Sequence, residues 1–179
     1  MKKVIISSIT VLILILSFLF DKELISFIAN NRLELLNPIF IILSIDYFLA
    51  IILALLTLFL LYKEKNKVIP FVSSIIVTYL VIAILKILIA RVRPDVITLI
   101  ETTTYSMPSR HAALAFMPLA FIQNKKFRII YIILAILISF SRLYNGLHFL
   151  SDLIIGSLIG YFIGLFFYKL EEKYQISKN

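Results

Sequence analysis

Two histidines and an aspartate are the residues of this chain that could perform nucleophilic and acid–base chemistry. His148 and Asp152 are four residues apart, so on a helix they share one face and the carboxylate can reach the imidazole. A carboxylate on one ring nitrogen fixes the tautomer and leaves the other nitrogen with a lone pair for attack. The spacing favours a histidine nucleophile, and the alternative is a structural hydrogen bond at a helix start.

Basic residues recur near these histidines and predict a site for an anion. Lys86 and Arg93 are two helical turns apart, so they project from one face at a separation of roughly 10 Å. Pro108-Ser109-Arg110-His111 opens a helix, which offers free backbone N–H groups beside a histidine. Arg142 precedes His148. Basic side chains that merely reach for the membrane interface would explain each lysine or arginine alone, but not the histidines.

The composition predicts an integral-membrane protein. The chain of 179 residues is 61% hydrophobic and 16% charged, which is too apolar for a soluble domain. It has no cysteine, so disulfides and thiolate chemistry are excluded, and two histidines with ten carboxylates predict no metal site. The net charge of +8 comes mostly from lysines that flank apolar runs, which is the positive-inside pattern, and no nucleic-acid partner is predicted.

Apolar runs predict an all-α bundle of six transmembrane helices in one domain, residues 1–179. The first run lacks a small-x-small cleavage site, so it is predicted to be a retained span rather than a signal peptide. The predicted spans are Val4–Phe20, 39–62, Val68–Ala90, 109–123, 129–144 and 150–168.

The segment between the first two spans mixes charged and apolar residues. Residues 22–37 are therefore predicted to lie in the membrane interface and to end near Asn37-Pro38. The second span has an alternative start at Asp46. This aspartate is interpreted as a helix cap at the surface, with a functional role as the alternative.

Charge counting orients the bundle. Six spans place both termini on one side, together with the loops around residues 63–67 and 124–128. That side carries 11 of the 18 basic residues and is predicted to be cytoplasmic. Those residues are Lys2, Lys3, Lys63, Lys65, Lys67, Lys125, Lys126, Arg128, Lys169, Lys173 and Lys178. The chemically distinctive stretches then meet on the outer face.

Three motifs in residues 86–152 resemble the signature of the type 2 phosphatidic acid phosphatase superfamily. They are Lys86-x6-Arg93-Pro94, Pro108-Ser109-Arg110-His111 and Ser141-Arg142-x5-His148-x3-Asp152. That superfamily includes bacterial undecaprenyl-diphosphate phosphatases and is related to vanadium haloperoxidases. Arg110 stands where the family usually has glycine, and Phe149-Leu150 stands where Tyr-Pro often follows the histidine.

The resemblance implies a metal-independent lipid phosphatase with no cofactor. Lys86, Arg93, Arg142 and Ser109 would hold the phosphoryl oxygens. His148 would attack phosphorus to form a phosphohistidine, with Asp152 orienting it. His111 would protonate the leaving oxygen and then activate water.

Substrate and assembly stay open at this point. A polyprenyl diphosphate is the favoured lipid, and Arg110 is predicted to bind its second phosphate, with a solvated surface arginine as the alternative. Phosphatidic acid, phosphatidylglycerol phosphate and lipid A 1-phosphate are the other candidates, and a transporter that binds a phosphate head group is the alternative class. Gly156, Gly160 and Gly164 predict close packing within the bundle or, alternatively, a homodimer contact.

Overall fold

The chain folds into a helical bundle around one long C-terminal helix. This computed structural model describes the backbone of residues 2–178, and the side chains of residue 8 and residues 11–177. The side chains of Lys2, Lys3 and Lys178, which enter the charge count, lie outside the described residues. The α-helices are α1 Lys2–Asn30, α2 Asn37–Ser44, α3 Asp46–Lys63, α4 Val68–Ile89, α5 Arg110–Phe116, α6 Lys125–Tyr144 and α7 Leu150–Lys178. Short 3-10 turns are η1 Glu34–Leu36, η2 Lys65–Lys67 and η3 Met117–Ala120.

The all-helical prediction is confirmed among the described residues, but the count of six spans is not. Four helical segments there are long and apolar enough to cross a membrane: Asp46–Lys63, Lys65–Ile89, Lys125–Tyr144 and Leu150–Ser177. The predicted span over 109–123 is instead the short α5 followed by η3, and Pro118 lies in the first turn of that 3-10 helix. Its residues are buried inside the bundle and not exposed around it.

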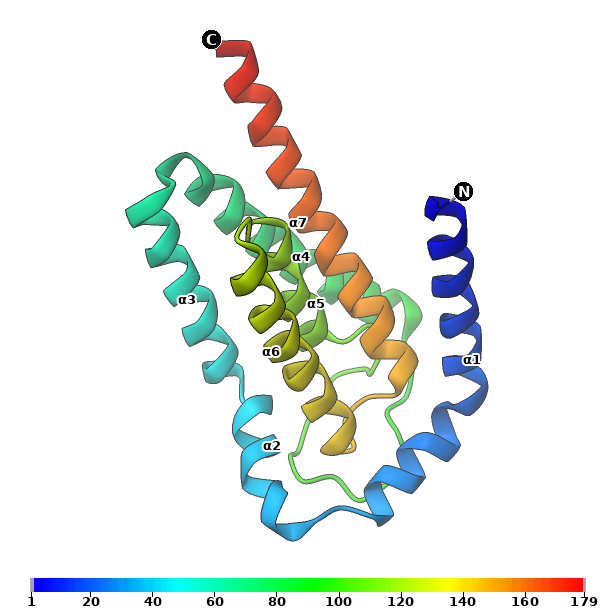
Figure 1. The fold of residues 1–179 in the computed structure, drawn as a ribbon. Coiled ribbons are helices and arrows are strands. Elements are labelled where there is room, and N and C mark those ends of the chain that lie inside the picture. Colours follow the sequence, from blue (N-terminus) through cyan, green and yellow to red (C-terminus); the bar gives the residue numbers. More distant parts are fainter. Residues whose placement is uncertain (1, 179) are drawn as a thin grey trace.

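Helix α7 crosses the bundle diagonally and packs against α1, α4, α5 and η3 (Figure 1). The glycine stripe explains how α5 and η3 approach it so closely. A Cβ atom at Gly156, Gly160 or Gly164 would lie 2.4, 1.9 or 2.3 Å from a carbonyl oxygen of residue 109, 113 or 117. The stripe is therefore covered by the same chain, as the packing prediction required, and it offers no face to a second copy.

Helix α1 continues beyond the predicted end of the first span. Residues 22–30 extend α1 without a break, and the predicted place of residues 22–37 in the membrane interface stays a prediction. Just before this segment, the carboxylate of Asp21 is 2% exposed and binds Arg91 across the bundle. The segment does end at Asn37-Pro38, as predicted, where proline occupies the first turn of α2.

The alternative start of the second span was correct. Extended backbone at Ile45 separates α2 from α3, and Asp46 is the first residue of α3. Ile45 occupies the N-cap position, and its apolar side chain cannot accept a hydrogen bond from the helix. The carboxylate of Asp46 contacts Arg110 and His111 of α5 instead. The interpretation of Asp46 as a simple helix cap was therefore wrong.

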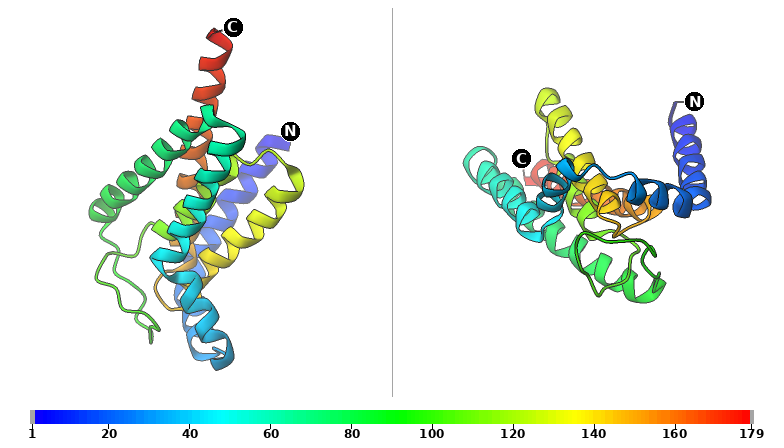
Figure 2. Two further views of the ribbon diagram at one scale, coloured as in Figure 1. Left: turned by 90° about the vertical axis from the view of Figure 1, so that its left-hand side faces the viewer. Right: turned by 90° about the horizontal axis from the view of Figure 1, so that it is seen from below.

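The connections sort to two ends of the bundle. Both ends of the chain and the turn at η2 lie at the upper end in Figure 1, while the long connection from α4 to α5 and the turn from α6 to α7 lie at the lower end. The views in Figure 2 show the same long connection folded beneath the helices. This connection and the α6–α7 turn carry the polar residues of the signature motifs.

Candidate active site

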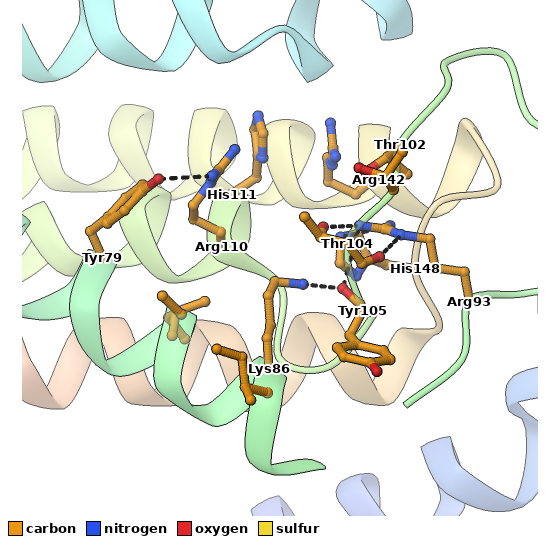
Figure 3. A pocket seen from close by; sticks show the side chains of 14 residues that line it. Tyr79, Lys86, Arg93, Thr102, Thr104, Tyr105, Arg110, His111, Arg142 and His148 are labelled. Carbon is orange, nitrogen blue, oxygen red and sulfur yellow. Dashed lines mark hydrogen bonds between the residues drawn. The ribbon is translucent and has the colours of Figure 1, made fainter. Parts of the chain in front are cut away.

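A pocket of about 410 Å³ collects most of the residues that the sequence singled out. It lies between α4, the α4–α5 connection, the start of α5 and the end of α6. Six predicted site residues line it, namely Lys86, Arg93, Arg110, His111, Arg142 and His148 (Figure 3). The other two, Ser109 and Asp152, lie behind this wall and are fully buried.

Lys86 and Arg93 hold the α4–α5 connection against the pocket. Helix α4 ends at Ala90, whose left-handed backbone (φ 49°) turns the chain so that Arg93 reaches back over the pocket. The Lys86 ammonium donates to the carbonyls of residues 105 and 106, and Arg93 donates to the backbone and side chain of Thr104 (Figure 3). The two cations thereby position the threonine-rich stretch that forms one side of the cavity.

His148 lies at the inner end of the pocket with a cation on one side and a carboxylate on the other. Its Nε2 is 3.4 Å from an Arg93 guanidinium nitrogen, and its Nδ1 is 3.5 Å from Asp152 Oδ2. The second distance is that of close neighbours and not of a formed hydrogen bond, because Nδ1 has no hydrogen-bond partner. Apo catalytic contacts are often long in this way and tighten when substrate binds. Nε2 is therefore the ring nitrogen beside Arg93, and Nδ1 is the one beside Asp152.

Burial and charge keep the nucleophile candidate neutral. Burial, followed by the guanidinium groups of Arg142 and Arg93, holds the pKa of His148 well below its ordinary value of 6.5. Burial also lowers the pKa of Arg93, to about 10, so the guanidinium stays charged at neutral pH. The imidazole lone pair and the cation are therefore present together.

Asp152 is held by an arginine that sequence reasoning had not assigned. Arg91 donates to Asp152 Oδ1 at 2.7 Å and to Asp21 Oδ2 at 2.9 Å, and its guanidinium lies 4.1 Å over the ring of Phe149. Asp21 also accepts from the backbone N–H of Ser151. This network ties α1 to the first turn of α7. Asp152 Oδ2 accepts from the backbone N–H of Phe149 at 2.9 Å and lies 3.5 Å from His148 Nδ1. The signal in the sequence was slight, because Asp21 opens the charged stretch Asp21-Lys22-Glu23 at the end of an apolar run.

The start of α5 places His111 beside Asp46. The Ser109 hydroxyl accepts from the N–H of Ala112 and caps the helix, while the Ser109 N–H donates to the carbonyl of Asp152. Accepting from Ala112 leaves the Ser109 hydroxyl able to donate its own proton, so its expected role in the phosphoryl cradle stays a prediction. His111 Nε2 lies 3.2 Å from Asp46 Oδ1.

Arg110 is held by two partners at the pocket mouth. One guanidinium nitrogen lies 2.9 and 3.0 Å from the two oxygens of Asp46, and the other lies 3.5 Å from the hydroxyl of Tyr79. The side chain is still 33% exposed, so both the predicted binding of a second phosphate and the alternative of a solvated surface arginine stay open. Arg142 is positioned by Ser44, whose carbonyl and hydroxyl both accept from it at 2.6 Å.

The arrangement suits nucleophilic substitution at a phosphoryl group. Four cations and two imidazoles line the same cavity. Lysine and arginine supply the positive charge that a trigonal-bipyramidal phosphoryl transition state requires. Among the described residues, no group of three or more histidine, aspartate or glutamate side chains is arranged to hold a metal ion.

Comparisons with known proteins agree with this geometry. The PAP2 superfamily model matches residues 67–176. The chain is 30% identical over 169 residues to an undecaprenyl-diphosphatase of Sulfolobus acidocaldarius, which covers 89% of this chain and 82% of that protein. It is 34% identical over 90 residues to phosphatidylglycerophosphatase B of Bacillus subtilis, or 43% of this chain and 44% of that protein.

Two solved structures share the fold. LpxE of Aquifex aeolicus superposes with a TM-score of 0.74 at 29% identity over 84% of this chain and 95% of that one. The transmembrane PAP2-type phosphatidylglycerolphosphate phosphatase of Bacillus subtilis superposes with a TM-score of 0.72 over 97% and 96%, at 23% identity. The apolar helices and these relatives indicate a multi-pass membrane protein. The chain belongs to the PAP2 superfamily and is a lipid phosphatase.

Proposed function

We propose that this chain hydrolyses a polyprenyl diphosphate of the undecaprenyl type through a phosphohistidine on His148. The observation that carries the mechanism is the position of the His148 ring, which lines the cation-rich pocket with Nε2 3.4 Å from an Arg93 nitrogen and Nδ1 3.5 Å from Asp152. In the first step the Nε2 lone pair forms the bond to phosphorus while the bond to the leaving oxygen breaks. In the second step water attacks phosphorus and the P–N bond breaks.

His111 is proposed to handle the proton in both steps. Its Nε2–H would be given to the leaving oxygen, and the neutral ring would then take a proton from the attacking water. Lys86, Arg93 and Arg142 would bind the phosphoryl oxygens and offset the charge that develops on them. Because these cations supply the charge, the mechanism is proposed to need no metal ion and no cofactor.

The diphosphate substrate is supported by Arg110 and by one relative. Arg110 lines the same pocket as the cations proposed to bind the first phosphate. Asp46 holds its guanidinium beside His111. The relative matched over most of both chains is an undecaprenyl-diphosphatase. Phosphatidic acid, phosphatidylglycerol phosphate and lipid A 1-phosphate remain the competing substrates. Family membership argues against the head-group transporter, because transport needs no nucleophile.

The architecture and sidedness are proposed together. Residues 1–179 would form one domain of six membrane-crossing elements, with α1 and the buried α5–η3 completing the four long apolar segments. The termini and the basic turn at η2 would face the cytoplasm, and the pocket would face outward. Their separation to opposite ends of the bundle supports this orientation (Figure 1).

A lipid panel tests the substrate. Purified protein in detergent should release inorganic phosphate from a polyprenyl diphosphate with a higher specificity constant than from the three monophosphate lipids. Arg110→Gly should lower the diphosphate value by ~10-fold, the scale of one charged contact, and the monophosphate values much less. Equal losses on all substrates would mean that Arg110 only supports the loop, and preference for a monophosphate lipid would reject the diphosphate.

A further inference from the structure

The corner between α2 and α3 places a carboxylate beside the catalytic pocket that none of the three signature motifs contains. Asp46 Oδ1 lies 3.2 Å from His111 Nε2 and 2.9 Å from an Arg110 nitrogen. Its side chain is 67% exposed, so solvent can reach it. Ser44 in the same corner holds Arg142, so two residues of one turn contact two different groups of the site.

The surroundings of His111 oppose a positive charge on its ring. The imidazole is 3% exposed, and Arg110 and Arg142 line the same pocket, as do Lys86 and Arg93. His148, the remaining titratable neighbour, also faces this cavity. Among the described residues, Asp46 is the one carboxylate within 4.0 Å of His111. Burial and neighbouring cations both favour the neutral ring, whereas the opposite charge of Asp46 and a hydrogen bond to the backbone of Ser44 favour the protonated one.

The reaction nevertheless needs that proton. A leaving alkoxide has to be protonated as the bond from oxygen to phosphorus breaks, and the donor must be charged beforehand. We infer that Asp46 is a positioning residue that keeps His111 protonated for the leaving oxygen, and that its ion pair with Arg110 limits this effect. The inference rests on the proposed role of His111 as the acid. Its proton passes from Nε2 to the leaving oxygen, the ring becomes neutral, and water returns the proton in the second step.

The ion pair gives the two residues opposite effects on His111. Removing the charge of Asp46 leaves the imidazolium among cations only, so the pH at which His111 loses its proton should fall. Removing the charge of Arg110 takes away a neighbouring cation and frees Asp46, so that pH should rise. A merely structural tie between α3 and α5 predicts no such opposition, because either variant would loosen the same contact.

The nature of the leaving group separates the roles further. When phosphatidic acid is cleaved, the leaving group is the diacylglycerol alkoxide, which needs a proton from the general acid. When a polyprenyl diphosphate is attacked at its terminal phosphorus, the leaving group is a phosphate monoester, which needs that proton much less. Loss of Asp46 should therefore penalise the alkoxide substrate, while loss of Arg110 should penalise the diphosphate. The two substrates thus report on different parts of one ion pair.

The experiment compares Asp46→Asn with Arg110→Met, which keeps the bulk of the side chain, in purified full-length protein. In Asp46→Asn the basic limb of kcat/KM should move to lower pH by about one pH unit, the lower end of the effect of an opposite charge. In Arg110→Met it should move up. At the pH of the wild-type basic limb and above it, Asp46→Asn should lose about tenfold on phosphatidic acid and less than about threefold on the diphosphate. Asp46→Glu should restore most of the loss.

A double variant provides the control. In a His111→Gln background, Asp46→Asn should cause no further movement of the basic limb, because the group it acts on is gone. Losses in Asp46→Asn that are equal at every pH and for both substrates would overturn the inference while leaving the phosphohistidine mechanism intact. A wild-type protein that releases no phosphate from any lipid would instead overturn the proposed function itself.

Discussion

Gly160 is the position where one methyl group should disturb the active site from a distance. A Cβ atom there would lie 1.9 Å from the carbonyl oxygen of Ala113 and 2.6 Å from its carbonyl carbon. Both contacts are with backbone, so no side chain can rotate away. Helix α5 would have to retreat by on the order of 1 Å to restore van der Waals contact. His111 lies two residues before Ala113 on the same short helix and would move with it.

Two opposing terms decide the magnitude of Gly160→Ala. Alanine favours a helix over glycine by about 1 kcal/mol, which would stabilise α7. Overpacking at a rigid contact costs about 1–3 kcal/mol, and contact with backbone places this site at the upper end. We therefore expect a net loss of about 1–2 kcal/mol in stability. A displacement of about 1 Å in a catalytic group should cost about 100-fold in kcat, which exceeds the effect on folding.

The assay pairs a thermal melt in detergent with phosphate release at saturating lipid. Gly160→Ala should lower the midpoint by a few degrees and kcat by about two orders of magnitude. Phe162→Ala, at an exposed position two residues along the same helix, is the matched control and should leave kcat unchanged. A Gly160→Ala protein with wild-type kcat and an unchanged or raised midpoint would refute the close packing of α7 on α5.

Three further predictions concern the chemistry and the orientation. Because burial and cations hold the pKa of His148 below 6.5, the neutral nucleophile should persist in mild acid. The acid limb of kcat/KM should therefore have an apparent pKa below 6.5. An acid limb at 6.5 or above would mean that the ring is protonated in the free enzyme. Activity should survive excess EDTA and be inhibited by vanadate, an analogue of the pentacoordinate phosphoryl group, whereas loss in EDTA that magnesium restores would contradict charge stabilisation by lysine and arginine alone. A cysteine at the exposed Thr103 should react with an impermeant thiol reagent on intact cells, and one at Asn66 only after permeabilisation, on a background free of native cysteine; the reverse pattern would place the pocket in the cytoplasm.

Local spacing predicted the members of the site well. His148 and Asp152 are one helical turn apart, and Arg110 and His111 are adjacent, so their proximity follows from helix geometry and chain connectivity alone. The convergence of the three motifs was expected from span parity, and residues of all three line one pocket, although the number of spans is not confirmed. The glycine stripe likewise predicted close packing within the bundle, because small residues at four-residue spacing permit close approach between helices.

The partners of these residues could not be predicted in the same way. Asp21 and Arg91 are 70 residues apart, and Asp46 and Arg110 are 64 apart, so their pairing depends on the complete packing of the bundle. An aspartate in an apolar run is equally consistent with a helix end and with a buried ion pair. That ambiguity left the partner of Asp21 unpredicted and assigned Asp46 to a cap.

Trapping the phosphoenzyme tests the central claim most directly. Wild-type protein, mixed with a lipid labelled in its terminal phosphate and quenched within one turnover, should carry label that is stable in base and released by acid. Peptide mapping should locate that label on His148, and His148→Ala should fold with a normal melt yet carry none. Label on a serine, stable in acid, or turnover by His148→Ala would contradict the account.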